Sequence, residues 1–302
     1  MAAILVCGGA GTVGRFVVEG LLARGHEVAV AGRTRPAEGY FSVPVGFRTL
    51  SLEPAEIDPE LFRGIDHVVH AAFDHVEGKY RGGEGTDPDG FVRRNLQGSI
   101  ALFETAQTAG VRRLVFLSSR AVYGLKQAGE TLTEATEPEP ETLYGQVKLD
   151  AEKALLAMAG ESFEPVVLRV TGVYGPAGPG REHKWSALIR NLLDGLPVAA
   201  RTATEVHGDD VAGAVALVLE ADLDALGERL FNVSDLVVDR VDIARIVADT
   251  VGRRLPACAR SDASGLNVMD TRLLRALGWR PGGEERLRAT VAAMVAEAAA
   301  AQ

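Results

Sequence analysis

Short apolar runs alternate with helical patterns over the first part of the chain. The runs that have the length and composition of buried strands are 2–7, 26–32, 47–52, 65–73, 111–119 and 163–170. Apolar residues recur with helical spacing at 16–25, at 89–110 and in the segment after Thr142. Strands that alternate with helices indicate βαβ units, so the pattern predicts a parallel sheet that helices cover on both faces.

The pattern changes after Tyr174. A stretch rich in glycine and proline at 175–185 is followed by helical patterns at 186–195 and 208–221 and by a strand pattern at 229–233. From Asp235 onward the chain is mostly helical and finishes in an alanine-rich segment. We interpret this second part as a smaller, mainly helical lobe that returns one helix and one strand to the large sheet.

Composition narrows the class of protein. Of the 302 residues, 47% are hydrophobic and 24% are charged, which is typical of a soluble globular protein. The net charge of −9 argues against nucleic acid or an anionic membrane as the main partner. No run of 18 apolar residues occurs, so we expect no membrane span. Cys7 and Cys258 lie far apart in the sequence, so we expect free thiols in a reducing cytoplasm.

Three glycines follow the first predicted strand. Gly8, Gly11 and Gly14 give the spacing G-x-x-G-x-x-G directly before the first helical pattern. Glycine permits a tight turn there and a close approach of the backbone to a pyrophosphate, toward which the helix N–H groups point. The spacing differs by one residue from G-x-G-x-x-G, but its place between a strand and a helix predicts a dinucleotide-binding loop.

The end of the second predicted strand bears on which dinucleotide binds. An acidic residue at this place accepts hydrogen bonds from the adenosine ribose, whereas an arginine accommodates a 2′-phosphate. Here Gly32 stands in the position of the acid, and Arg33 and Arg35 follow it. Guanidinium groups bind phosphate in fork geometry, so the sequence favours NADP over NAD.

A tyrosine and a lysine stand four residues apart near the start of the helical segment after Thr142. Tyr144 and Lys148 share one face of a helix, so both can meet the same ligand. A free phenol, with a pKa of about 10, is a poor base at neutral pH, and a nearby ammonium favours the phenolate. The pair predicts a proton-transfer site for a carbonyl or alcohol held against a nicotinamide, with Lys148 also holding the cofactor ribose.

A serine ends the fifth predicted strand. In an open α/β sheet, ligands bind in the crevice outside the carboxyl ends of the strands, where Ser119 is expected. Its hydroxyl is suited to hydrogen-bond the substrate oxygen, polarise it and fix its distance from Tyr144. His67 and His70 flank the fourth predicted strand without an acidic third ligand nearby, so we expect no metal site.

Together with these residues, longer segments of the sequence resemble the extended branch of the short-chain dehydrogenase/reductase superfamily, also called the NAD-dependent epimerase/dehydratase family. The matching segments keep the family's order and cover nearly the whole chain: "GGAGTVG" (8–14), "HAA" (70–72), Asn95 with Gly98, "SSRAVYG" (118–124), "YGQVK" (144–148), "LRVTGVYGP" (168–176), "VHGDDVA" (206–212) and "LGWRP" (277–281). The resemblance implies an α/β fold with a Rossmann-type doubly wound parallel sheet at 1–171 and 207–234. A smaller, mainly helical substrate-binding lobe would take up 172–206 and 235–302.

The resemblance also implies roles for individual residues. Ser119, Tyr144 and Lys148 would form the catalytic set, with Asn95 supporting its geometry. Ser51 stands where relatives often carry an aspartate toward the adenine. The expected cofactor-binding residues are Gly8, Gly11, Thr12, Val13, Gly14, Arg33, Arg35, Ser51, Leu52, Ala71, Ala72, Asn95, Tyr144, Lys148 and Thr171.

Two substitutions distinguish the chain from relatives that act on nucleotide-diphosphate sugars. Gly172 replaces an asparagine that follows the sixth strand, and Ala203 replaces an arginine that meets the diphosphate. The loss of a charge-assisted pair is worth about 1.5–3 kcal/mol. We therefore expect a small-molecule substrate without a nucleotide. Its candidate contacts are Ser119, Arg120, Tyr144, Gly172 and Lys184.

Three functions fit these residues to different degrees. The favoured one is an NADP-dependent oxidoreductase that transfers hydride between nicotinamide and a small carbonyl or alcohol, such as a sugar, a sugar acid or a hydroxyketone. The second is a nucleotide-sugar 4-epimerase or dehydratase with tightly bound NAD. The third is a non-catalytic dinucleotide sensor, against which the complete set of Ser119, Tyr144 and Lys148 argues, because a sensor needs no proton donor.

The resemblance further implies a homodimer. Relatives commonly pair through the helices that correspond to 88–109 and 142–159. Candidate surface residues, which the sequence places equally well in the core, are Ile100, Leu102, Phe103, Leu149 and Leu155.

Overall fold

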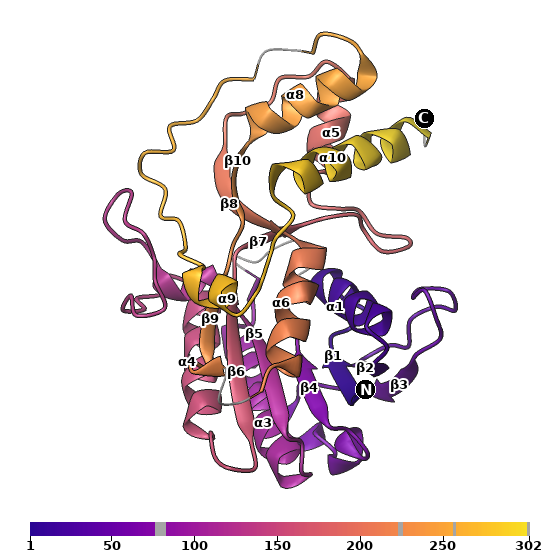
Figure 1. Ribbon diagram of the computed structural model, residues 1–302, viewed down its shortest axis with the longest axis vertical. Helices are drawn as coiled ribbons and strands as arrows, with labels where there is room; N and C mark the ends of the chain where they lie inside the picture. The colour runs from indigo at the N-terminus through magenta and orange to yellow at the C-terminus, as the bar shows by residue number, and fades with distance from the viewer. Residues whose placement is uncertain (76–82, 223–225, 256–257, 301–302) are drawn as a thin grey trace.

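The computed structural model describes residues 1–75, 83–222, 226–255 and 258–300. Its central feature is a sheet of seven parallel strands in the order β3-β2-β1-β4-β5-β6-β9 (Figure 1). The strands are β1 (Ala3–Cys7), β2 (Glu27–Gly32), β3 (Gly46–Thr49), β4 (His67–His70), β5 (Arg113–Ser119), β6 (Glu164–Val170) and β9 (Leu230–Val233). Because β1 lies between β2 and β4, the strand order reverses there, and in open α/β sheets ligands bind outside the carboxyl ends of the strands at such a point.

Helices cover both faces of this sheet. On one face α1 (Thr12–Ala23) packs against α6 (Gly208–Glu220), and on the other α3 (Gly98–Thr108) packs against α4 (Leu143–Ala157). Ile4 and Val6 of β1 enter the first core, whereas Leu5 and Cys7 enter the second. A central strand buried on both faces needs an apolar side chain at every position, which explains the continuous apolar run in the sequence.

The predicted alternation of strands and helices is confirmed, and the helical pattern at 89–110 forms a continuous helical stretch with a π-helical turn within it. It forms α2 (Pro88–Val92), a π-helical turn labelled η3 (Arg93–Gln97) and then α3. Within the π-helical turn, the Asn95 amide donates a hydrogen bond to the backbone oxygen of Phe91 at 3.0 Å. A side chain that bonds the backbone competes with the regular helical ladder, and such bulges are frequent at functional sites.

Three short 3-10 helices complete the first part of the chain, and the third predicted strand is shorter than expected. The 3-10 helices are η1 (Pro54–Glu56), η2 (Pro59–Phe62) and η4 (Arg120–Tyr123). Strand β3 ends at Thr49, so Ser51 and Leu52 lie beyond it.

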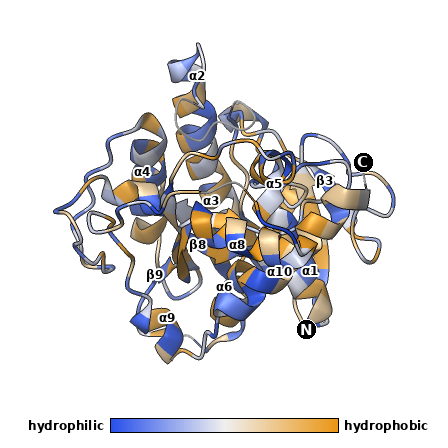
Figure 2. Ribbon diagram, turned by 90° about the horizontal axis from the view of Figure 1, so that it is seen from above, coloured by the Kyte–Doolittle hydropathy of each residue, from blue (hydrophilic) through white to orange (hydrophobic). Residues whose placement is uncertain are grey.

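The second part of the chain lies above the carboxyl ends of the large sheet in Figure 1. It contains α5 (Ser186–Leu193), α8 (Arg240–Val251) and α10 (Gly283–Ala300), and α8 and α10 lie side by side (Figure 2). The short α9 (Arg272–Ala276) instead lies beside β9 of the large sheet (Figure 1). The mainly helical character of this second part is confirmed, but it also holds a three-stranded sheet that the sequence pattern does not predict. The strands are β7 (Gly172–Tyr174), β8 (Thr202–His207) and β10 (Leu236–Asp239). Each is short, and none forms a long apolar run, so periodicity gives little signal.

Four of the five residues suggested for a dimer surface belong to the core. Leu102, Phe103 and Leu155 are fully buried within the single chain, and Leu149 is nearly so. Only Ile100 keeps partial exposure. The sequence left both placements open. The structure places Leu102, Phe103 and Leu155 in the core between α3, α4 and the sheet, and Leu149 in a small separate cluster with Val122 and Tyr123. The homodimer itself stays a prediction, as do the exact domain boundaries.

The structure also bears on the two thiols and on the hydropathy of the helices. Cys7 and Cys258 are both free thiols, and burial raises the pKa of Cys7 to about 12, which makes it inert at neutral pH. Across the residues that the structure describes, no helix is both long and apolar enough to cross a bilayer.

Candidate active site

The three glycines form a cradle between β1 and α1. A Cβ atom on Gly14 would lie 2.2 Å from the backbone oxygen of Gly8, and one on Gly8 would lie 2.6 Å from the nitrogen of Ala72. Gly8 also has a φ of +79°, which side chains disfavour. Only glycine at positions 8 and 14 therefore lets the turn after β1, the start of α1 and the segment at Ala72 approach one another so closely.

The cradle opens on the N-terminus of α1. Gly11 is the N-cap residue of α1. Among the described residues, no side chain caps this end of the helix, and its first turn contains no acidic residue. Thr12 and Val13 begin the helix, so their N–H groups have no partner within it. Unpartnered amides at the positive end of a helix bind phosphate, so the residues present fit the pyrophosphate of a dinucleotide.

Tyr144 and Lys148 meet at one aromatic ring. Phe73, which follows β4, packs edge-on against Tyr144 with ring centroids 5.1 Å apart. The Lys148 ammonium lies 4.6 Å from the centroid of the same ring and 4.6 Å from that of Phe116 in β5. The helical spacing seen in the sequence thus places both side chains at the carboxyl ends of β4 and β5.

Lys148 is buried, and its ammonium donates a hydrogen bond of 2.8 Å to the backbone oxygen of Leu117. Burial lowers its pKa to about 7, and the nearby Glu152 carboxylate opposes that shift. Burial also lowers the pKa of His70 to about 3, and Lys148 adds to this effect. His70 is therefore neutral at pH 7, and its ring nitrogen is hydrogen-bonded to Ser99 at 2.9 Å.

Two adjacent serines at the end of β5 have different surroundings. Ser118 is buried and hydrogen-bonds Glu152, which in turn forms a buried ion pair with Arg169. Ser119 is half-buried, and its Oγ accepts a hydrogen bond of 3.1 Å from the Ala121 N–H, which caps η4. Because that hydroxyl proton is not used by the cap, Ser119 retains a donor for a ligand at the crevice.

Asn95 fastens the chain segment that leaves β4. Its Oδ1 accepts a hydrogen bond from the Asp74 N–H at 2.6 Å, and its Nδ2 donates to the Asp74 backbone oxygen at 2.7 Å. Asn95 is itself buried, so the pairing is shielded from water. The support role expected for Asn95 therefore has a concrete partner, the backbone of Asp74.

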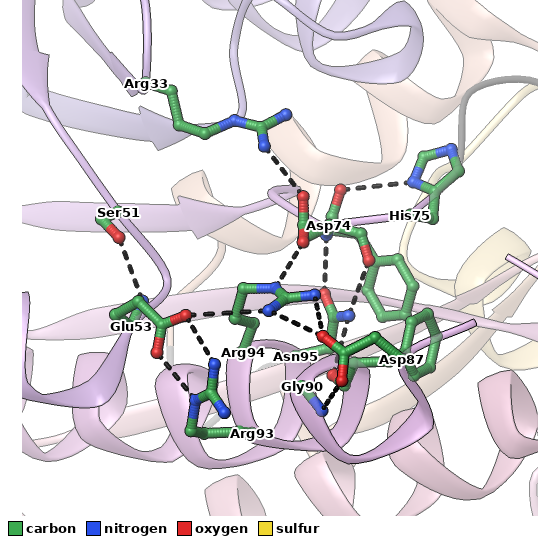
Figure 3. Close-up of polar contacts among 12 residues, drawn as sticks. Arg33, Ser51, Glu53, Asp74, His75, Asp87, Gly90, Arg93, Arg94 and Asn95 are labelled. Carbon is green, nitrogen blue, oxygen red and sulfur yellow. Dashed lines mark hydrogen bonds and ion pairs between the residues drawn. The ribbon is translucent and has the colours of Figure 1, made fainter. Parts of the chain in front are cut away.

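Arg33 and Arg35 are both engaged in this structure. The Arg33 guanidinium forms an ion pair of 2.9 Å with the Asp74 carboxylate (Figure 3), and the Arg35 guanidinium lies 5.0 Å from the Phe47 ring centroid. Ser51 accepts a hydrogen bond of 3.2 Å from the Glu53 N–H. The predicted adenosine-side residues thus lie beside a network of charges that the sequence did not single out.

The remaining predicted cofactor residues lie along the same edge of the sheet. Ala71 and Ala72 follow β4, and the Ala71 N–H donates to the Cys7 oxygen at 2.9 Å. The Leu52 oxygen would lie 1.9 Å from a Cβ on Gly98, so these segments touch through backbone. Thr171 donates to the Thr204 oxygen at 2.9 Å and so links the end of β6 to β8.

A cavity of about 260 Å³ lies in the smaller lobe. Its basic lining residues are Lys184, Arg201 and Arg240, and its apolar residues include Trp185 and Val198. The Lys184 ammonium forms an ion pair of 2.5 Å with the nearly buried Glu205. A cavity lined by cations and apolar side chains suits a ligand with both anionic and apolar parts.

The predicted substrate residues differ in whether they contact this cavity. A Cβ on Gly172 would lie 2.9 Å from the Lys184 ammonium and 2.8 Å from a Glu205 carboxylate oxygen, so Gly172 touches the cavity wall. Ala203 also lines the cavity. Arg120 instead donates to the Asn267 backbone oxygen at 3.0 Å, which ties η4 to the segment before α9.

Sequence reasoning missed Phe73, Asp74 and Glu205. Phe73 and Asp74 directly follow the "HAA" segment, so their position at the carboxyl end of β4 was a usable signal. Glu205 belongs to a strand that periodicity did not reveal. Within the described ranges, the structure contains no cluster of three or more residues able to hold a metal ion.

The glycine cradle, the Tyr144–Lys148 pair and the doubly wound sheet define an NAD(P)-dependent enzyme of the extended short-chain dehydrogenase/reductase type. The model of the NAD dependent epimerase/dehydratase family matches residues 4–234, and the chain belongs to this family.

Individual relatives are similar to this chain in sequence or in structure. The dTDP-6-deoxy-L-talose 4-dehydrogenase (NAD(P)(+)) of Kitasatospora kifunensis is 33% identical over 205 residues, which are 67% of this chain and 61% of that protein. The UDP-glucose 4-epimerase of Corynebacterium glutamicum is 27% identical over 307 residues, covering 92% of this chain and 90% of that one. The solved Thermus thermophilus UDP-glucose 4-epimerase, in complex with NAD, has a TM-score of 0.76 at 31% identity and covers 97% of this chain and 98% of its own.

Proposed function

We propose that this protein oxidises a secondary hydroxyl of a nucleotide-sugar substrate with a nicotinamide dinucleotide, in a 4-epimerase or related 4-dehydrogenase reaction. The observation that carries the proposal is the meeting of Tyr144 and Lys148 on the Phe73 ring, one residue beyond Ala72, which the glycine cradle touches. When bound, the dinucleotide supplies a hydride acceptor at its nicotinamide.

The chain's own residues would handle the proton and the orientation of the substrate. The Tyr144 phenolate oxygen takes the proton of the substrate hydroxyl as the carbon loses its hydride, and it returns that proton when the carbonyl is reduced. The Lys148 ammonium stabilises the phenolate through its charge. The Ser119 hydroxyl donates a hydrogen bond to the reacting oxygen and holds it near Tyr144.

A nucleotide sugar is preferred over the small substrate favoured by the sequence for two reasons. The relatives with printed substrates act on dTDP- or UDP-linked sugars. The cavity lining also carries Lys184, Arg201 and Arg240 against the one acid Glu205, and this excess of positive charge suits a diphosphate although Ala203 replaces the arginine found in relatives. We infer that this charge compensates for the missing arginine, and Lys184 is one of the contacts that the sequence already suggested.

The expected preference for NADP is not part of this proposal. Arg33 already pairs with Asp74 and Arg35 already packs on Phe47, so neither guanidinium is held ready for a 2′-phosphate. The solved relative carries NAD, and the Kitasatospora enzyme is named for both dinucleotides.

The direct test is to incubate the purified protein with UDP-glucose and with dTDP-linked 6-deoxy sugars, with and without added NAD. We expect either interconversion of the sugar epimers, followed by NMR, or net formation of NADH, followed by absorbance. Turnover of free sugars or hydroxyketones without turnover of any nucleotide sugar would restore the small-substrate hypothesis. Dinucleotide binding without any turnover in this panel would favour the sensor.

A further inference from the structure

Asp74 lies at the carboxyl end of β4 and contacts the arginine that follows β2. We propose that Asp74 supplies the acid that β2 lacks at Gly32, and that it thereby sets a preference for NAD over NADP. The inference rests on the dinucleotide site of the proposed function, but it concerns the choice of cofactor rather than the sugar chemistry.

The position of the Asp74 carboxylate is fixed from several sides (Figure 3). One oxygen accepts from Arg33 at 2.9 Å, and the other accepts from the Arg94 Nε at 2.6 Å. The Asp74 backbone is held at both its N–H and its oxygen by the buried Asn95. The Arg33 side chain is 78% exposed and Asp74 only 22%, so the acid is the more enclosed member of the pair and the arginine the more solvated one.

The charges around Asp74 leave little attraction for an added phosphate. The connected network holds three guanidinium groups, of Arg33, Arg93 and Arg94, and three carboxylates, of Glu53, Asp74 and Asp87. The charges of these six side chains therefore balance. A 2′-phosphate brought to Arg33 would lie beside the Asp74 carboxylate, and like charges in close contact repel.

A ribose hydroxyl, unlike a phosphate, is a hydrogen-bond donor that the Asp74 carboxylate can attract. An ionised carboxylate has about four lone-pair sites, and the two arginine bonds occupy only two of them. Asp74 therefore retains capacity to accept a hydrogen bond from the 2′-hydroxyl of NAD. This is the role that an acid at the end of the second strand plays in dinucleotide-binding folds.

The test measures the binding of NAD⁺ and NADP⁺ by calorimetry, without a sugar substrate. We expect the wild-type protein to bind NAD⁺ more tightly. Asp74→Asn should strengthen NADP⁺ binding by about tenfold, because the repulsion is lost, and should weaken NAD⁺ binding. Asp87→Asn is the matched control: it removes a carboxylate from the same network without touching Arg33, so it should leave the ratio of the two affinities unchanged.

A second variant tests the acid itself. Within the described chain, a Cβ on Gly32 would meet no atom within 4 Å, so Gly32→Asp fits. In the Asp74→Asn background, Gly32→Asp should restore the preference for NAD⁺. Tighter binding of NADP⁺ by the wild-type protein would overturn the proposal, and so would an Asp74→Asn ratio equal to that of the wild type.

Arg33→Ala keeps the proposal testable if Asp74→Asn does not fold. Without Arg33 the Asp74 carboxylate is less compensated, so NADP⁺ affinity should fall while NAD⁺ affinity is kept, and a loss of about tenfold for both dinucleotides would contradict the proposal. Because every readout is cofactor binding, these outcomes are independent of whether nucleotide sugars are the substrate.

Discussion

The Lys148 ammonium donates a hydrogen bond of 2.8 Å to the backbone oxygen of Leu117, two residues before the candidate Ser119. This contact joins α4, which carries Tyr144, to the end of β5, which carries Ser119. A hydrogen bond from a charged donor to a fixed backbone acceptor is strong in a buried setting. It therefore sets the register between the two elements from which the three candidate catalytic side chains come.

The first prediction concerns Tyr144. Tyr144→Phe keeps the ring on Phe73 but removes the hydroxyl, so turnover should fall by about 10²–10⁴-fold while NADH affinity stays within a few-fold. Single-turnover kinetics and a fluorescence titration of NADH measure the two quantities. Tyr123→Phe, which removes a buried hydroxyl bonded to Asn232, is the control for loss of stability alone. Undiminished turnover in Tyr144→Phe would remove the basis of the proposed chemistry.

The second prediction concerns the titration of Lys148. Its pKa is about 7 in the folded protein, against about 10.4 for lysine in an unfolded chain. Between these values the unfolded chain binds more protons, so this group makes stability rise as the pH rises from 7 toward 10. Below pH 7 the lysine is protonated in both states, and the full desolvation penalty of its charge remains.

Lys148→Met should therefore show a smaller rise in stability than the wild type between about pH 6 and about pH 9 in urea unfolding. Lys153→Met changes an exposed lysine of the same helix and should keep the wild-type slope. Identical slopes for the wild type and Lys148→Met would show that Lys148 does not titrate in this window.

The third prediction concerns the glycine cradle. Gly14→Ala places a methyl group 2.2 Å from the Gly8 oxygen, so the loop must shift. We expect a loss of roughly 1–3 kcal/mol in the free energy of unfolding, together with weaker dinucleotide binding. Gly213→Ala in α6 is the control: among the described residues its Cβ would meet no atom within 4 Å, and it should stabilise by about 0.5–1 kcal/mol. Wild-type dinucleotide affinity in Gly14→Ala would contradict the assignment of the cradle.

The fourth prediction concerns the cavity in the smaller lobe. Lys184→Met removes a cation from its wall, so the KM for a diphosphate-linked sugar should rise by about 10- to 150-fold, while a free sugar is unaffected. Arg190→Met removes a guanidinium that pairs with Glu182 at the surface, so its KM should match that of the wild type. Equal effects of Lys184→Met on both kinds of sugar would point to a structural role through Glu205.

The sequence by itself determined the features that depend on local spacing. The run of Gly8, Gly11 and Gly14 between a strand and a helix predicted the cradle. Such a prediction is possible because the backbone atoms that leave no room for a side chain are close in the sequence, as between Gly14 and Gly8. The four-residue spacing of Tyr144 and Lys148 predicted a shared helical face, which the shared contact with Phe73 bears out. Continuous apolar runs predicted the parallel sheet, because strands covered on both faces have no polar side.

The tertiary structure alone decided which distant residues meet. Arg33 and Asp74 are 41 positions apart, and only the adjacency of β2, β1 and β4 brings the arginine to the acid. The same holds for Lys184 and Glu205, because Glu205 lies on β8 of a sheet that periodicity did not reveal and Lys184 lies in the segment between β7 and α5. The apolar character of Leu102 and Leu155 likewise did not show whether they lie in the core or at an interface, because an apolar residue suits both. The structure shows that both are buried in the core. The hydrophobic pattern of one segment determines which secondary structure that segment can form. The interaction energies between segments determine which segments pack together, and these energies cannot be read from a single sequence.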